Sequence, residues 1–118
     1  EKLYEYVTTH NQNMQESAGQ IPLVAYNYAL KLDSSKRFED AVEVAESGYQ
    51  ACVDFCSYQL LPGFLHIMAE CHHFLGEDDK SKQLYIKACC FYQILGNERD
   101  LIALRDEAEK YLGLTLAV

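Results

Sequence analysis

Small and apolar side chains recur every three or four residues through most of this chain, in segments divided by short polar turns. Leu3, Val7, His10 and Met14 keep this spacing, which is that of one face of an α-helix. The same pattern predicts further helices over residues 22–33, 37–60, 63–75, 78–95 and 98–112. No β-hairpin signal occurs in the sequence. The chain is therefore predicted to be all-α, with about six helices, the first over 2–17.

Proline, glycine and serine residues indicate where these helices begin and end. Pro22 suits the first turn of a helix, where its missing N–H costs nothing. Gly48 lies in the middle of a predicted helix, where glycine is unfavourable, so we expect another helix to pack closely against it. The other boundaries are assigned to an N-cap at Ser34 or Ser35, a stop at Pro62 and Gly63, and stops at Gly76 and Gly96.

The length, apolar content and net charge of the chain limit the kind of protein that it can be. A chain of 118 residues with 49% apolar content suits a single domain, here residues 1–118, with a modest core. The net charge of −8 argues against nucleic-acid binding by this chain, because phosphate contacts need clustered Lys and Arg. No apolar run approaches the roughly 18 residues that cross a bilayer. Because the chain begins at Glu1 within a helical pattern, we expect it to be a fragment of a longer protein.

The five cysteines indicate the redox setting of the protein. They are Cys52, Cys56, Cys71, Cys89 and Cys90. An odd number argues against a closed disulfide framework, and all five fall within predicted helices, where free cysteine behaves as a small apolar residue. A reduced, cytoplasmic protein is therefore expected.

Two segments of the chain follow the same plan. Each begins with a polar turn and a charged helix start, in SSKRFEDAVEVAESGY and in GEDDKSKQLYIKACC. The corresponding positions are Ala41 and Ser81, Ala45 and Tyr85, Gly48 and Ala88, and, in the helix before each turn, Ala29 and Ala69. Small residues at fixed places let paired helices approach closely, so the pattern indicates an internal repeat of helical hairpins.

This pattern resembles the tetratricopeptide repeat. The best match is LGEDDKSKQLYIKA, through Leu75, Gly76, Ser81, Tyr85 and Ala88, and the second is RFEDAVEVAESG. Two features depart from the family: the offset from Ala41 to Ser81 is 40 residues, where the family has about 34, and the usual proline after the second helix is missing. The resemblance implies antiparallel helical hairpins stacked as a short right-handed solenoid.

A narrower resemblance concerns function. The long second helices, the many tyrosines and the ending FYQILGNERDLIALRDEAEKYLGL are similar to the C-terminal sensor half of Gram-positive, peptide-responsive helix-turn-helix (Xre-type) transcription regulators. That likeness implies a homodimer that binds a signalling peptide, with DNA bound through a separate N-terminal domain. The alternative is a tetratricopeptide-like scaffold that docks another protein. A helix-turn-helix upstream of Glu1 would favour the regulator, and further repeats would favour the scaffold.

The resemblance also implies where a ligand would bind. In such repeats the first helix of each hairpin lines the concave groove, which here means 22–33 and 63–75. The groove residues implied are Tyr26, Asn27, Leu30, His66, Glu70 and His73. Asn27 offers a donor and an acceptor to a peptide backbone, and Tyr26 offers a broad contact surface. The alternative is that these residues form an ordinary solvated helix face.

The run Cys71-His72-His73 raises the question of a metal or redox site. Consecutive residues of a helix point in directions about 100° apart, whereas zinc ligands must converge. Cys52 and Cys56 could share a helix face, but no second pair matches them. We therefore expect no metal and no cofactor, and keep a site at Cys71, His72 and His73 as a minor alternative. No catalytic motif occurs, so the chain is not expected to be an enzyme.

Overall fold

The structure is a computed structural model that describes residues 20–116, and these residues form helices and short turns. The prediction of an all-α chain is confirmed for this part, whereas the helix predicted over 2–17 lies outside it. The elements are α2 (Gln20–Ser34), α3 (Phe38–Asp54), the short 3-10 helix η2 (Tyr58–Leu60), α4 (Leu61–Phe74), α5 (Asp78–Leu95) and α6 (Glu98–Leu112).

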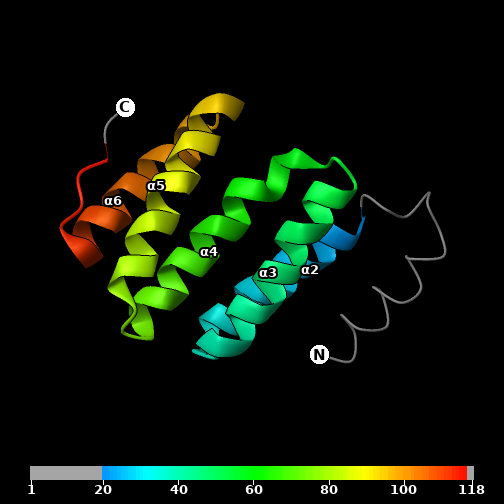
Figure 1. Ribbon diagram of the computed structural model, residues 1–118, viewed down its shortest axis with the longest axis horizontal. Coiled ribbons are helices and arrows are strands. Elements are labelled where there is room, and N and C mark those ends of the chain that lie inside the picture. The colour runs from blue at the N-terminus through cyan, green and yellow to red at the C-terminus, as the bar shows by residue number, and fades with distance from the viewer. Residues whose placement is uncertain (1–19, 117–118) are drawn as a thin grey trace.

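Successive helices lie side by side and antiparallel (Figure 1). Each helix packs on the next one in the chain, and α2 also contacts α4. The turns between α2 and α3, α4 and α5, and α5 and α6 are short, which favours this antiparallel arrangement of neighbours. Consequently α4 lies between the α2–α3 pair and the α5–α6 pair.

Glycines in the left-handed region end the helices where the sequence predicted stops. Gly76 has a φ of 82° just after α4, and Gly96 has a φ of 74° at the end of α5. Residues with a Cβ avoid this region, so glycine is the natural terminator at both places. The stops predicted at Gly76 and Gly96 are confirmed.

The prediction that Pro62 ends a helix is wrong. The third helix ends at Asp54, and α4 begins at Leu61, with Pro62 in its first turn. Proline is tolerated in a first turn because the N–H it lacks has no partner there, so Pro62 begins a helix and does not end one. The N-cap predicted at Ser34 or Ser35 is wrong too, since α2 runs through Ser34 and Arg37 precedes α3.

Several positions 40 residues apart are buried in both hairpins. The predicted pairs are all buried: Ala29 and Ala69, Ala41 and Ser81, Ala45 and Tyr85, Gly48 and Ala88. The same offset relates further buried pairs that the sequence comparison did not use: Pro22 and Pro62, Ala25 and Leu65, Cys52 and Tyr92. The internal repeat is therefore a repeat of packing positions as well as of residue types.

The polar residue of this repeat has its hydrogen bond satisfied inside the core. Ser81 is fully buried, and its hydroxyl donates to the backbone carbonyl of Ala69 at 2.6 Å. A buried hydroxyl without such a partner would be destabilising. The bond ties α5 to the middle of α4, where Ala69 leaves room for the approach.

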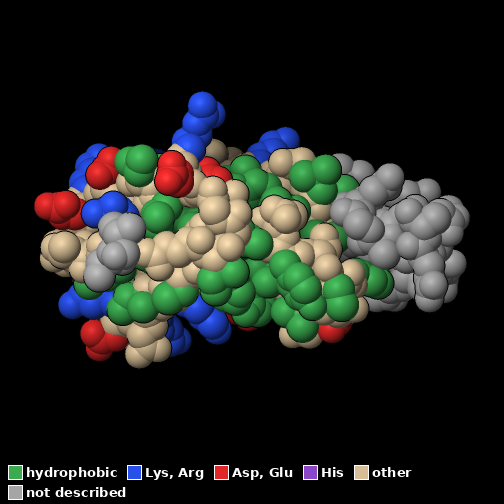
Figure 2. Space-filling view, turned by 90° about the horizontal axis from the view of Figure 1, so that it is seen from above, with side chains coloured by type: hydrophobic (Ala, Val, Ile, Leu, Met, Phe, Trp, Pro, Cys, Tyr) green, Lys and Arg blue, Asp and Glu red, His purple; other side chains and the backbone are tan. Residues whose placement is uncertain are grey.

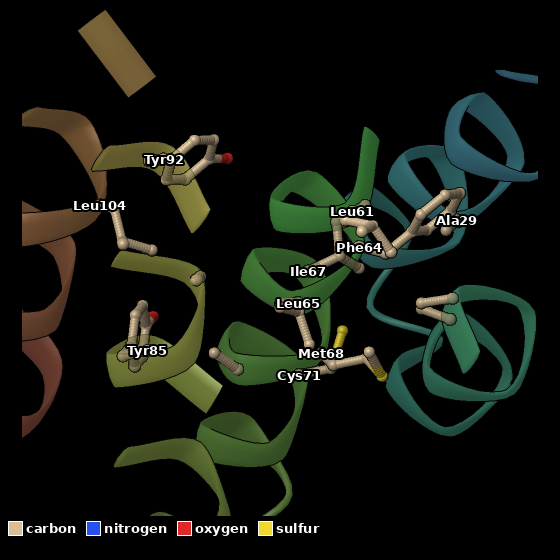
Figure 3. Close-up of a cluster of buried hydrophobic side chains, with 14 of the residues drawn as sticks. Ala29, Leu61, Phe64, Leu65, Ile67, Met68, Cys71, Tyr85, Tyr92 and Leu104 are labelled. Carbon is tan, nitrogen blue, oxygen red and sulfur yellow. The ribbon is translucent and has the colours of Figure 1, made fainter. Parts of the chain in front are cut away.

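The core is centred on α4, whose buried side chains point both toward α2 and α3 and toward α5 (Figure 3). The Phe64 ring fills the space next to Gly48: a Cβ added at Gly48 would lie 2.4 Å from that ring and 3.1 Å from the Cβ of Ala25. Only a residue without a Cβ fits at this contact between α2, α3 and α4. The close packing predicted from Gly48 is therefore confirmed.

The surface carries apolar groups at the end where α3 passes into α4 and along the outer helices. Hydrophobic side chains cover much of the face seen from above in Figure 2. The C-terminal tail returns to the core, since Leu116 is buried and Leu114 is partly buried. Among the residues that the structure describes, no helix combines the length and apolar character that a membrane span needs.

Candidate functional site

Side chains from α4 and α6 meet on a face that they share with α2. His66, near the middle of α4, donates from Nε2 to Oε2 of Glu107 in α6 at 3.0 Å. These residues are 41 positions apart in the chain, so the fold alone brings them together. α2 also contacts α4, and its Asp33 accepts a hydrogen bond from Cys71 of α4, so side chains of all three helices meet on this face.

Four titratable residues form the cluster at the centre of this face, which we call the His–carboxylate cluster: Asp33, His66, Glu70 and Glu107. His66 and Glu70 are four residues apart on α4, which places them on the same side of that helix. One ligand atom each of His66, Glu70 and Glu107 lies within 4.8 Å of the other two. Asp33, from the end of α2, accepts a hydrogen bond from the thiol of Cys71 at 3.6 Å. All four cluster side chains are partly buried.

Two tyrosines of α5 contact residues of the cluster. The hydroxyl of Tyr85, a fully buried side chain, donates to Oε1 of Glu107 at 2.6 Å. The Tyr92 hydroxyl lies 3.5 Å from Nδ1 of His66. Glu107 and His66 are thus each in contact with a tyrosine through the atom that they do not use toward each other. Burial, together with the Glu107 carboxylate, raises the pKa of Tyr85 far above its ordinary value, so the hydroxyl stays a donor.

The carboxyl groups of Glu70 and Glu107 differ in protonation at neutral pH. Burial, and next the negative charges of Glu107 and Asp33, raise the pKa of Glu70 to about 8. Burial acts in the same direction on Glu107, but the hydrogen bond and charge of His66 outweigh it and lower the pKa of Glu107. Glu107 is therefore the ionised carboxylate paired with His66, and Glu70 carries the proton.

Of the predicted residues of α2, Tyr26 contacts α4, whereas Asn27 and Leu30 are exposed. Tyr26 is partly buried and meets the Phe64 ring edge-on, with the ring centroids 5.6 Å apart. It lies against α4 because Gly63 has no Cβ, which would otherwise lie 2.7 Å from the Tyr26 ring. Burial, and then the charge of Asp100 in α6, raise the pKa of Tyr26. Asn27 and Leu30 are exposed on α2.

His73 continues the line of His66 and Glu70 along α4 toward α6. Its ring stacks on that of Tyr111, with centroids 4.9 Å apart and the planes 12° apart. Its Nδ1 donates to the carboxylate of Asp78 at 3.0 Å. The structure therefore brings Tyr26, His66, Glu70 and His73 to contacts between α4 and its neighbours.

The run Cys71-His72-His73 does not converge on one point. The Cys71 thiol faces Asp33, and burial, followed by the charge of Asp33, raises its pKa far above the ordinary value. His72 pairs instead with Glu77 at 2.9 Å, and His73 with Asp78, at the start of α5. The run therefore connects α4 to α2 and to the first turn of α5.

The cysteine pair that sequence spacing suggested is divided. Cys52 is buried in α3, whereas Cys56 is exposed in the turn after it, with a φ of 54°. The two thiols therefore do not share a helix face, because α3 ends at Asp54, between them. The expectation that all five cysteines lie within helices is wrong for Cys56.

Sequence reasoning missed Asp33, Glu107, Tyr85 and Tyr92 as parts of this site. The repeat offset held a usable signal for one of them. An offset of 40 residues takes Tyr26 to His66, and a step of 41 takes His66 to Glu107. Extending the 40-residue offset into α6 leads from His66 to Asp106, the residue before Glu107, so the repeat indicates only the part of α6 that approaches His66.

The site as a whole is a partly buried, acidic and aromatic surface. Carboxylates in such a setting favour cationic groups, because partial burial weakens screening by solvent. The aromatic rings of Tyr26 and Tyr111 flank the cluster along the same face. Comparisons of the chain with models of protein families, with curated proteins and with solved structures found no match in any of the three.

Proposed function

We propose that α2, α4 and α6 form the concave side of a short, right-handed, tetratricopeptide-like solenoid, and that this side binds a peptide or protein segment. The observation that carries the proposal is the meeting of side chains from alternate helices, His66 of α4 with Glu107 of α6, on the face that α2 joins. The burial shared by the named pairs of positions 40 residues apart supports a repeating hairpin. The domain would serve as the sensor and dimerisation part of a transcription regulator.

The charge of the face selects the kind of segment it would bind. Asp33, Asp100 and Glu107 give this face a negative field, and the net charge of the chain is −8. Complementary charge raises association rates and disfavours partners of the same sign. The ligand is therefore a basic segment with an apolar or aromatic side chain that packs on Tyr26 and the exposed Leu30.

Replacing Tyr26 or Asn27 by alanine is expected to weaken binding of a basic peptide by about 1–3 kcal/mol each. Loss of the Tyr26 ring would remove contact area with the peptide. Loss of the Asn27 amide would leave a backbone group of the peptide without its hydrogen bond. The measurement is fluorescence anisotropy with labelled peptides recovered from a pool of charged and neutral sequences. The matched control is Tyr49→Ala, because Tyr49 is a partly buried tyrosine of α3, where Lys87 lies over its ring.

A different pattern of losses among these variants would count against this site. If Tyr49→Ala weakens binding while Tyr26→Ala and Asn27→Ala do not, the segment binds the opposite side of the helix stack. Peptides that bind best when acidic would contradict the electrostatic part of the proposal.

The proposed dimer is expected to form through the outer face of α6. Ile102 is 57% exposed on this last helix, and end helices of a helix stack expose an apolar face unless it is covered. Light scattering at high micromolar concentration should give a dimer, and Ile102→Glu should give a monomer. Ile86 of α5, which is 48% exposed, supplies the control Ile86→Glu. A wild-type chain that is monomeric at that concentration would remove the dimer from the proposal.

A further inference from the structure

The His–carboxylate cluster has the composition and geometry of a cation site, and this observation is independent of peptide binding. We infer that His66, Glu70 and Glu107 bind a divalent transition-metal ion of the zinc type between α4 and α6. Their ligand atoms already lie within 4.8 Å of one another. Nothing in this inference depends on whether the face also binds a peptide.

The distances are close to those that a tetrahedral ion requires. Zinc binds nitrogen and carboxylate oxygen at about 2.0–2.2 Å, so two ligand atoms around it lie about 3.4 Å apart. His66 Nε2 and Glu107 Oε2 are 3.0 Å apart, slightly closer than that. Glu70, one helical turn from His66, needs only side-chain rotation to complete the set. Small rotamer changes, without movement of the helices, would therefore form the site.

The donor set selects the class of ion. One imidazole nitrogen with two carboxylate oxygens suits zinc and its first-row neighbours, whereas Mg²⁺ and Ca²⁺ favour all-oxygen sites. Asp33 lies beside Glu70 at the end of α2 and adds further negative charge. The single cationisable residue of the cluster is His66, so a divalent cation would add positive charge beside three carboxyl groups, and its binding would displace the proton that Glu70 carries.

Tyr85 and Tyr92 of α5 contact the proposed ligands in the way that supporting residues contact the ligands of metal sites. Metal-bound histidine usually donates its other ring N–H to a neighbouring oxygen, and ligating carboxylates are usually hydrogen-bonded as well. With the ion on Nε2, the proton of His66 would be on Nδ1, facing the Tyr92 oxygen 3.5 Å away. Tyr85 already holds Oε1 of Glu107, which directs Oε2 toward His66. Both supports come from a third helix and exist independently of the three ligands.

The experiment is a calorimetric titration of the chelator-treated full chain with Zn²⁺. One ion is expected to bind per chain, and His66→Gln and Glu107→Gln should each weaken binding at least tenfold. Tyr85→Phe should weaken it by about tenfold while keeping all three ligands, as changes in supporting residues do. The control is His72→Gln, because His72 lies on the same helix as His66 and pairs with Glu77 at 2.9 Å, but it is not one of the three converging residues. Circular dichroism of each variant establishes that it is folded.

Cobalt substitution distinguishes this site from the cysteines. Co²⁺ bound by imidazole and carboxylates gives weak visible bands, whereas thiolate ligands add intense near-ultraviolet charge-transfer bands. The inference is overturned if those thiolate bands appear, if His72→Gln weakens zinc as much as His66→Gln does, or if Mg²⁺ competes at equal concentration. It is also overturned if the folded wild-type chain binds no stoichiometric Zn²⁺.

Discussion

The Phe64→Ala variant is expected to lose about 3–5 kcal/mol in its free energy of unfolding. Phe64 is fully buried, and its ring contacts Tyr26 of α2 and the site of Gly48 in α3. Removal of the ring leaves a cavity where three helices meet, so the loss includes lost burial and lost contacts around the cavity. Urea unfolding followed by circular dichroism gives the value.

The partner change Gly48→Ala should have opposite effects in the two backgrounds. In the wild-type chain the new Cβ would lie 2.4 Å from the Phe64 ring, so overpacking should destabilise by about 1–3 kcal/mol. In the Phe64→Ala chain the ring is gone and only the 3.1 Å contact with the Cβ of Ala25 remains, so alanine should stabilise the helix by up to about 1 kcal/mol through its propensity. Gly48→Ala that is neutral or stabilising in the wild-type chain would show that α3 and α4 are not packed as described.

Stability should fall as the pH rises from about 5 to about 8.5, and Glu70→Gln should remove most of this fall. Burial and the charges of Glu107 and Asp33 raise the pKa of Glu70 from 4.5 to about 8 in the folded chain. A group with a raised folded pKa contributes fully below its unfolded pKa and loses that contribution as the pH rises through the folded pKa. The pKa shift of Glu70 sets an upper limit near 5 kcal/mol on the loss of folding stability. Partial exposure of Glu70 to solvent reduces the expected loss to about 1–3 kcal/mol.

The measurement is urea unfolding across this pH range in a buffer that contains a chelator, so that only protons occupy the carboxylates. Glu107 does not disturb the comparison, because its pKa is lowered and its contribution is lost only at acidic pH. The exposed Glu109→Gln on α6 serves as the control and should keep the wild-type pH dependence. A wild-type stability that is constant between pH 5 and 8.5 would contradict the protonated Glu70 of the cluster.

Helical periodicity was sufficient to predict the class of fold and most helix boundaries. The helices over 78–95 and 98–112 agree with α5 and α6, because a strong apolar period was bounded by glycine and polar turns. One wrong helix boundary lies at a residue that is compatible with two positions in a helix. Pro62 is compatible with the end of one helix and with the first turn of the next, and the sequence pattern did not distinguish them. The interruption at Cys56 was missed because the apolar residues around it continue the helical spacing.

The candidate site was predictable only in its local part. His66, Glu70 and His73 follow from spacing on one helix, and Gly48 signalled a close helix contact. Glu107 and Asp33 could not be inferred from spacing within a helix, because their approach depends on how α6 and α2 pack beside α4. Tyr85 was named from the sequence only as a position of the repeat, and its hydrogen bond to Glu107 depends on tertiary geometry. Pairing across helices is therefore the part of the site that requires the structure.

Amide chemical-shift mapping by NMR would show whether a bound peptide lies on α2, α4 and α6, the helices that we propose form the binding face. The labelled chain would be titrated with a lysine- and arginine-containing peptide recovered from the pool. The largest shifts are expected on residues around Tyr26, His66, Glu70 and Glu107, on those three helices. Shifts concentrated on the outer faces of α3 and α5, around Tyr49 and Ile86, would contradict it.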